Sequence, residues 1–289
     1  MLNNYPSFTI SIDLELAWGF WDKLNSTHLN NVVNNERIIV DQLLKIFEDF
    51  QFPVTWATVA ALIDNKNKMT NIFDKNAWYA PDIIEKIMKS KTKHLIASHS
   101  YSHINFNENS KSIIIEDFEK AEYFFKTLNI LPDVLIFPRN QVAHLEILNK
   151  FNFKFYRSLD KSWYKKVSKH SKLFGKVANI ADKIFPFKTN PIKPIKHLNG
   201  LIEIPSSILL ISRNGFKLPV TNINMFYKIK KGVQRAIENK ECFHLWFHPS
   251  NFYYKENKQF ELLKDVLRFV NSKREQGLID IKVLDQYVT

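Results

Sequence analysis

The sequence predicts an α/β fold in which parallel strands are joined by helices. Short runs of apolar and β-branched residues alternate along the chain with longer segments whose apolar residues recur at helical spacing. Each helical segment is long enough to return the chain to the same end of a sheet, so consecutive strands are expected to pair in parallel. Polar residues that could carry chemistry also stand where several predicted strands end.

The N-terminal half alternates strands and helices regularly. Apolar and β-branched runs predict strands over residues 8–16, 53–62, 93–98 and 133–137. Helical spacing predicts helices over residues 35–50, 81–89 and 113–128. Pro81 stands at the start of the second helix, a position where proline is well tolerated.

The C-terminal half continues this alternation. Strands are predicted over residues 154–157, 201–206, 242–247 and 278–283. Helices are predicted over residues 142–151, 223–239 and 260–273. The sequence has no repeat of fixed period and no low-complexity linker, and its length suits one large core, so residues 1–289 are expected to form a single domain.

Residues 161–196 differ in composition from the rest of the chain. They contain ten lysines against one acid, Asp182, and their apolar residues recur at nearly helical spacing before three prolines. This pattern predicts an insertion at about residues 161–200 that carries a basic amphipathic helix. Two interpretations remain open: a surface helix packed on the domain, or a contact with an anionic substrate or with the inner membrane surface.

The overall composition excludes several classes of protein. A net charge of +12 favours anionic partners, although a compositional bias towards lysine explains it equally well. A single cysteine, Cys242, excludes an internal disulfide and a cysteine-based zinc site. No membrane span, secretory signal or nucleic-acid-binding motif is visible, so the expected location is the cytoplasm and no nucleic acid is expected as a partner.

Two histidines four residues apart follow the strand predicted over residues 93–98. If the segment from His99 to His103 turns helically, both imidazoles face the same way and can bind one metal ion. The pair also suits a polar loop in which each histidine is hydrogen-bonded structurally. Taken alone, it leaves both interpretations open.

Asp13 and Glu15 lie within the first predicted strand. Residues two apart on a strand point to the same face, so the two carboxylates project together. Burying acids in an apolar strand is unfavourable unless they are paired or bound to metal. Two carboxylates can divide the work of metal ligand and general base, and a solvated strand end is the simpler alternative.

Histidine also ends the strand predicted over residues 242–247. His248 is followed by Pro249, which suits a fixed general acid. His244 and Trp246 share its face of the strand. For His244 we favour a hydrogen-bonded core histidine.

Together these segments resemble the polysaccharide deacetylase family of carbohydrate esterases, over roughly Phe8 to Pro249. The resemblance implies a distorted (β/α) barrel of about seven parallel strands. His99-Ser-Tyr-Ser-His103 is similar to the second family motif, which implies that both histidines are metal ligands. Asp13-Leu-Glu15 stands where the family has two adjacent acids, which implies that Asp13 is the catalytic base and Glu15 the third ligand.

The remaining motifs match the family less closely. Phe137-Pro-Arg-Asn140 is similar to the third motif, whose arginine orients the base, so the resemblance gives that role to Arg139. Leu245-Trp-Phe-His248 fits the fifth motif, which implies that His248 protonates the leaving group. Asp160 and Trp163 match the fourth motif faintly. The predicted substrate or oxyanion contacts are Asn140, Trp246 and Asp160.

The resemblance implies a metal-dependent hydrolase that removes an acyl group, in the first place N-acetyl, from a sugar. One divalent transition metal ion is expected, zinc before cobalt, nickel or iron. The expected substrate is an intermediate of bacterial surface-polysaccharide synthesis on a nucleotide or lipid diphosphate, which would suit the basic charge. The alternatives are hydrolysis of a non-glycan C–N bond, such as that of a cyclic imide, and a non-catalytic glycan-binding protein that retains the barrel.

Overall fold

A curled, mostly parallel sheet organises the computed structural model, which describes residues 5–22, 27–66, 73–159 and 191–287. The strands are β1 (Ser7–Leu14), β2 (Thr55–Thr58), β3 (Leu95–Ser98), β4 (Val134–Ile136), β5 (Phe155–Ser158), β6 (Ile195–Lys196), β7 (Ile202–Pro205), β8 (Ile208–Leu209), β9 (Cys242–Phe247) and β10 (Asp280–Ile281). Their order in the sheet is β6-β7-β5-β4-β3-β2-β1-β9-β8, and β10 also pairs with β1. All pairs are parallel except β6 with β7.

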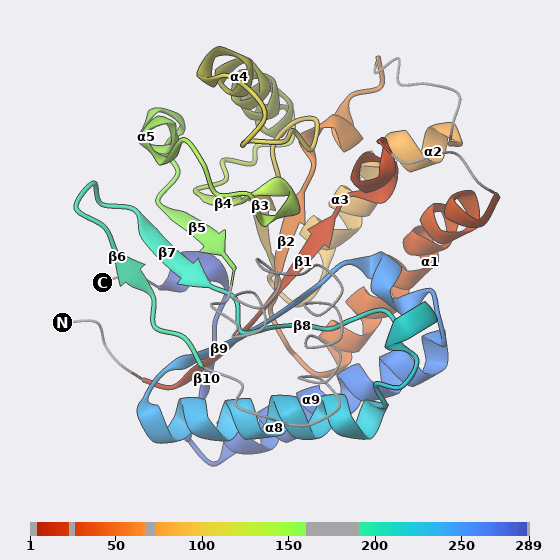
Figure 1. Cartoon of the computed structure of the whole chain (residues 1–289), viewed down its shortest axis with the longest axis vertical. Helices are drawn as coiled ribbons and strands as arrows, with labels where there is room; N and C mark the ends of the chain where they lie inside the picture. Colours follow the sequence, from red (N-terminus) through yellow and green to blue (C-terminus); the bar gives the residue numbers. More distant parts are fainter. Residues whose placement is uncertain (1–4, 23–26, 67–72, 160–190, 288–289) are drawn as a thin grey trace.

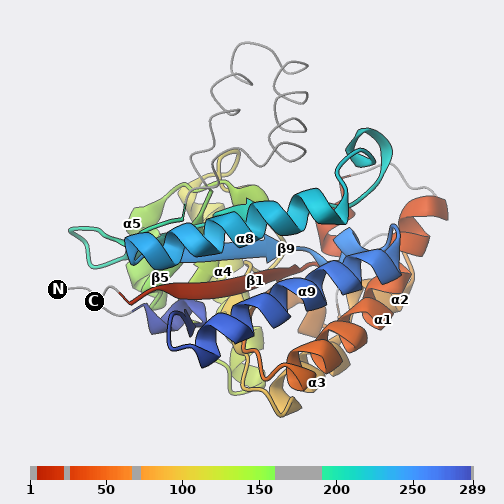
Figure 2. The ribbon, with the colours of Figure 1, turned by 90° about the horizontal axis from the view of Figure 1, so that it is seen from below.

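Helices surround the sheet (Figure 1). They are α1 (Thr27–Asp49), α2 (Lys75–Trp78), α3 (Pro81–Lys89), α4 (Lys111–Thr127), α5 (Leu145–Leu148), α8 (Asn222–Asn239) and α9 (Glu256–Glu275). Figure 2 shows α8 and α9 running side by side along β9 and β1. Within the described ranges, no helix has the length and hydropathy that a membrane span requires.

The central strand, β1, is buried along its whole length. It pairs with β2 through Ser11–Leu14 and with β9 through Ser7–Ile12. Its sequence alternates small hydroxyl residues (Ser7, Thr9, Ser11) with apolar ones, and its first charged residue is Asp13. Within β1, charge therefore enters the centre of the fold near the carboxyl end of the strand.

The sheet curls because one segment joins its two ends. β7 pairs with β5, whereas β8, three residues later, pairs with β9. Between these strands the Ser206 N–H donates to the Ser158 carbonyl, and the Ser207 N–H donates to the His244 carbonyl, both at 2.8 Å. Residues 202–209 therefore cross from one end of the sheet to the other, and the predicted distorted barrel is confirmed.

Most predicted elements occur, with differences at their ends. Helix α3 has the predicted bounds, whereas α1 begins at Thr27, eight residues before the predicted start. The helix predicted over residues 142–151 is a short α5 followed by a 3-10 turn over Asn149–Phe151. Among the described residues the sheet has ten strands instead of about seven. β6, β8 and β10 are pairings of only two residues, and of these three only β10 lies in a predicted strand, that over residues 278–283. The predicted basic helix falls almost wholly outside the described residues.

Candidate metal centre and active site

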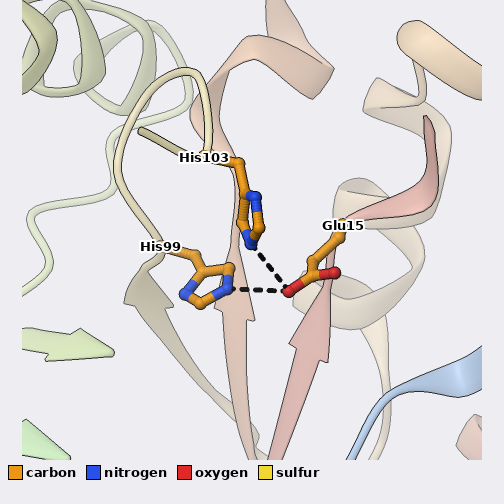
Figure 3. A group of neighbouring side chains, drawn as sticks. All are labelled: Glu15, His99 and His103. Atoms are coloured by element: carbon orange, nitrogen blue, oxygen red, sulfur yellow. Dashed lines mark hydrogen bonds and ion pairs between the residues drawn. The ribbon is translucent and has the colours of Figure 1, made fainter. Parts of the chain in front are cut away.

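The predicted site residues gather at the carboxyl edge of the sheet. Glu15 directly follows β1, His99 follows β3 and His248 follows β9. Since these strands run parallel, their carboxyl ends meet at one edge, which is where α/β barrels build active sites. Figure 3 shows the side chains of Glu15, His99 and His103 pointing toward one another.

Three donor atoms converge within this group. The Nε2 atoms of His99 and His103 each lie 3.0 Å from Oε1 of Glu15 (Figure 3). All three residues are buried, and their ligand atoms lie within 4.8 Å of one another. Two imidazoles and one carboxylate form a common zinc-ligand set that leaves positions open for water or substrate.

The hydrogen bonding of His99 supports a cation at this point. Its Nδ1 lies 2.6 Å from the Ile136 carbonyl, which only accepts, so Nδ1 carries a proton. In a neutral imidazole, Nε2 then presents a lone pair toward the carboxylate of Glu15. The lone pair of Nε2 and the carboxylate oxygen would repel each other, because both are acceptors. A metal ion between them removes this repulsion, so these side chains fit a metal.

The loop that carries the two histidines is held by an aspartate from α4. Ser100 and His103 have left-handed backbone conformations, with φ of 64° and 56°, so the expected helical turn is not formed. Asp117 accepts hydrogen bonds from the backbone N–H groups of Tyr101 and Ser102 at 2.7 and 3.0 Å, and from the Ser102 hydroxyl at 2.5 Å. These contacts fix the loop in the conformation that turns both imidazoles toward Glu15.

Asp13 is bound by Arg157 in a two-point ion pair. The Nη1 and Nη2 atoms of Arg157 donate to Oδ1 and Oδ2 of Asp13 at 2.7 and 2.6 Å, and both side chains are buried. Burial alone would raise the pKa of Asp13, but the guanidinium outweighs it and the pKa lies below its usual value. Arg157 also donates to Oδ1 of Asn140 at 2.9 Å and lies over the ring of Trp246 at 4.4 Å.

This geometry corrects the prediction for Arg139. Its guanidinium donates to Asp22 at 2.6 Å instead of contacting Asp13. The reason is local: Arg139 has a left-handed φ of 53° in the turn after β4, whereas β5 directs Arg157 into the barrel. The available signal for Arg157 was a lone charge inside an apolar strand, which is unfavourable to bury without a partner.

A chain of hydrogen bonds continues from Arg157 into the core. Nη1 of Arg157 donates to the Ser11 hydroxyl at 2.9 Å, and that hydroxyl lies 2.8 Å from Nε2 of His244. Nδ1 of His244 donates to the Pro205 carbonyl at 3.1 Å. Burial and the nearby Arg157 lower the pKa of His244 to about 3, so it is a neutral core histidine, as we favoured.

His248 lies opposite the histidine pair. Its Nε2 is 3.5 Å from Oε1 of Glu15 and 3.7 Å from Oδ2 of Asp13, and its backbone N–H donates to Asn251. Burial lowers the pKa of His248, but the carboxylates of Glu15 and Asp13 overcome this effect and raise it to about 9. The side chain is one-quarter exposed, so a substrate can reach it.

A cavity of about 400 Å³ opens over these groups. Its lining residues are Asp13, Glu15, Gly19, Phe20, Asp22, His103, Arg139, Asn140, His248 and Ser250. Asn140 thus lies where a substrate contact was predicted. Trp246, the second predicted contact, lies under Arg157 outside this lining, because the guanidinium covers its ring. The third, Asp160, lies outside the described residues.

Comparison with known proteins agrees with this architecture. Residues 35–155 match the model of the polysaccharide deacetylase family, a range that includes His99 and His103. The fold is similar to that of a candidate polysaccharide deacetylase from Mycobacterium smegmatis, with 13% identity and a TM-score of 0.68 over 99% of this chain and 90% of that chain. Among curated proteins, no sequence matches significantly.

Two further crystal structures share the fold. The PuuE allantoinase has 11% identity and a TM-score of 0.65 over 99% of this chain and 90% of its own. A candidate deacetylase from Pseudomonas aeruginosa PAO1 has 11% identity and a TM-score of 0.63 over 97% and 89%. At these identities the likenesses show the fold alone. Residues 35–155 are thus similar to the polysaccharide deacetylase family, and the whole chain shares the fold of these structures.

Proposed function

We propose that this protein is a metal-dependent hydrolase that removes the N-acetyl group of an acetylated sugar. The observation that carries the proposal is the convergence of Glu15, His99 and His103 beside the carboxylate of Asp13. The match of residues 35–155 to the polysaccharide deacetylase model supports deacetylation of sugars in general. The dependence on metal and the roles of individual residues are our proposal.

Glu15, His99 and His103 would hold the ion, and zinc suits this ligand set best. A divalent ion bound there would lower the pKa of a water molecule and polarise the acyl carbonyl. The contact of His99 Nδ1 with Ile136 orients its ring so that Nε2 faces the centre.

Two residues move protons in this scheme. Asp13 takes the proton from the attacking water, and Arg157 keeps its carboxylate ionised and oriented. His248 lies across the cavity and donates a proton to the departing amine. The side-chain amide of Asn140 lines the cavity beside Asp13 and can contact the acyl oxygen as charge develops there.

The proposal for the biological substrate rests on the charge of the chain and not on the geometry of the site. We propose an acetamido sugar of surface-polysaccharide synthesis, carried on a nucleotide or lipid diphosphate, because a net charge of +12 favours anionic molecules. A cytoplasmic location and a membrane contact through residues 161–196 remain predictions. Comparing acetate release from UDP-N-acetylglucosamine and free N-acetylglucosamine checks the carrier; equal turnover of both would count against it.

A second candidate is hydrolysis of a non-glycan C–N bond. It is favoured by the fold shared with the PuuE allantoinase. Assays of acetamido sugars beside cyclic imides separate the two activities. If neither class is turned over by metal-loaded protein, a non-catalytic glycan-binding role becomes the better explanation.

The first experiment is to measure bound transition metal in the purified protein and in the His99→Ala, His103→Ala double variant. We expect close to one ion per chain in the parent and little in the variant. His197→Ala is the matched control, because His197 is a partly exposed histidine bonded to Glu203 away from the centre. A parent that stays metal-free after incubation with zinc, cobalt or nickel would overturn the proposal.

A further inference from the structure

We propose that Arg139 and Asp22 form a recognition pair for the hydroxyl groups of an uncharged sugar ring. The inference rests on the proposed function for the reaction at the metal centre, and it adds the substrate class that the cavity selects. Both side chains line the cavity, and each is about one-third exposed. A ligand at the metal centre can therefore reach both.

The role of Arg139 follows from what Arg157 does. Because Arg157 makes the two-point contact with Asp13, the base needs no second arginine. Nη2 of Arg139 instead donates to Oδ2 of Asp22 at 2.6 Å, and the pair lies among the cavity residues. An ion pair in this place faces the substrate, not the core.

The backbone at Arg139 and Asn140 directs the side chains of these two consecutive residues to different partners. Arg139 and Asn140 are consecutive residues with left-handed φ values of 53° and 54°, a strained conformation for residues other than glycine. The turn lets Asn140 accept a hydrogen bond from Arg157 while Arg139 reaches Asp22. Strained backbone of this kind is concentrated at functional sites, where surrounding contacts maintain it.

The chemistry of the pair favours hydroxyl groups over a fixed anion. A guanidinium has five N–H donors and a carboxylate only accepts, so the two groups offer donors and acceptors side by side. A sugar hydroxyl both donates and accepts and can therefore bond to both partners. A phosphate only accepts at neutral pH, and the charge of Asp22 repels it.

Phe20 completes this wall of the cavity. It follows Gly19 in the 3-10 helix after β1, and both residues line the cavity with the pair. An aromatic ring beside paired polar groups suits a pyranose, which has an apolar C–H face and a polar edge. A cyclic imide has no hydroxyl group for the pair to bind, so this wall favours a sugar over the second candidate substrate.

The test compares Arg139→Gln and Asp22→Asn with the parent, using zinc-loaded protein and two probes. The probes are N,N′-diacetylchitobiose, which has ring hydroxyls, and p-nitrophenyl acetate, which has none. We expect KM for the sugar to rise about 10-fold, as loss of one or two hydrogen bonds predicts, with kcat changed far less. Hydrolysis of p-nitrophenyl acetate and zinc content are expected to stay at the parent level.

Asp82→Asn is the matched control. Asp82 is bonded to Arg37 in a similarly exposed ion pair that is not part of the cavity lining. Asp82→Asn should change neither KM for the sugar nor the hydrolysis of p-nitrophenyl acetate. Equal loss on both probes, or loss of zinc, in the Arg139 and Asp22 variants would show that the pair supports the metal centre, and unchanged KM for the sugar would show that it does not bind substrate.

Failure of the proposed function is recognised separately, by calorimetric titration of N,N′-diacetylchitobiose and N-acetylgalactosamine. If the parent binds a sugar but releases no acetate, deacetylation fails, and the affinities of the variants still decide the role of the pair. If the parent neither binds nor hydrolyses these uncharged sugars or UDP-N-acetylglucosamine, whose ring carries the same kind of hydroxyl groups, the substrate class proposed here is wrong.

Discussion

Asp13 and Glu15 are two residues apart, yet their neighbours prepare them for different tasks. Asp13 is bound on both oxygens by Arg157, whereas Glu15 directs one oxygen at two imidazoles. Burial opposes ionisation of both, but Arg157 lowers the pKa of Asp13, and His103 and His248 lower that of Glu15. These environments agree with the proposed roles of Asp13 as base and Glu15 as metal ligand.

Replacing Arg157 tests the first of these environments. In Arg157→Met the Asp13 carboxylate is buried without its partner, so we expect a loss of about 3–5 kcal/mol in unfolding free energy. Urea unfolding measures this loss, and acetate release should fall at the same time. Arg139→Gln, which removes a partly exposed pair, should cost about 1 kcal/mol or less; similar losses in both variants would contradict the assignment.

Gly19 tests the environment of Glu15. A Cβ atom at position 19 would lie 2.0 Å from Oε2 of Glu15, so Gly19→Ala must displace this carboxylate. We expect zinc affinity to fall about 10–100-fold, as for disturbed supporting contacts of metal ligands, measured by competition with a chelator. Gly232→Ala is the control: its Cβ would meet the Phe243 ring at 2.1 Å, which should lower stability and leave zinc affinity unchanged.

At the scale of single residues, the sequence predicted which residues lie together, but only some of the side-chain pairs that they form. Glu15 and His99 could be grouped because each stands near the end of a predicted strand, and His103 joined them through its spacing of four residues from His99. Arg157 and Arg139 could not be assigned correctly, since the partner of an arginine depends on the φ of a turn and on which face of a strand turns inward. Neither quantity is visible in residue spacing.

Among the elements, the loop over residues 98–103 is held by contacts from outside it in the conformation that places His99 and His103 beside Glu15. Its two left-handed residues, Ser100 and His103, require outside support, which Asp117 of α4 gives through three hydrogen bonds. Burial raises the pKa of Asp117, against the effect of these bonds. The loop and α4 therefore act together as the frame of the proposed metal centre.

Asp117→Asn should loosen that frame. The amide has one oxygen in place of two acceptors, and its NH₂ group would face a backbone N–H, so we expect zinc affinity to fall about 10-fold. Chelator competition gives the affinity, and circular dichroism checks that the fold remains. Asp64→Asn is the control, because Asp64 contacts only the hydroxyl of Tyr101 in this loop. Equal zinc affinity in all three proteins would refute the role.

Helix α1 contains a buried acid whose ionisation should oppose folding. Burial, and then the charge of Glu15, raise the pKa of Glu36 to about 8, and its Oε1 has no hydrogen-bond partner among the described residues. The unfolded chain loses this proton near pH 4.5, whereas the folded chain keeps it to about pH 8. Stability of the metal-free protein should therefore fall by about 1.4 kcal/mol per pH unit between these values from this group.

Glu36→Gln should remove that slope. The variant is expected to match the parent near pH 4 and to be more stable by a growing margin up to pH 8, as measured by urea unfolding across this range. Glu85→Gln, an exposed change on α3, should leave the slope in place. Parallel pH profiles for the parent and Glu36→Gln would show that Glu36 is not held in its protonated form.

Element boundaries show where local pattern stops being sufficient. α3 was predicted to the residue, because Pro81 marks its start and its apolar spacing is regular. The first turns of α1 were missed, since residues 27–34 are rich in asparagine and become helical through the burial of Val32 and Val33. β6 and β8 have two residues each, too few to show a period.

For the whole molecule, the alternation of strands and helices was enough to predict a parallel sheet. The same alternation does not predict how the two ends of that sheet are joined. Closure depends on residues 202–209 pairing with β5 at one end and β9 at the other. Such long-range pairing has no local signal. The insertion predicted at residues 161–200 stays a prediction.

Metal binding should stabilise the whole domain, because the ligands join β1 to the loop after β3. At a free zinc concentration 100 times Kd, we expect about 2.7 kcal/mol of added stability and a rise in Tm of several degrees. Thermal unfolding with and without chelator measures it. The His99→Ala, His103→Ala variant should show no rise, and an equal rise there would place the zinc elsewhere.

The position of β1 also has a consequence for synthesis on the ribosome. β1 is flanked by β2 and by β9, and β9 is made more than two hundred residues after it. A nascent chain can pair β1 on one side early but must leave its other edge open until residues 242–247 emerge. His248 leaves the ribosome immediately afterwards, so the edge that carries the proposed site is completed only after residues 242–248 have been made. Until then the exposed edge of β1 is the part of the nascent chain that needs protection from aggregation.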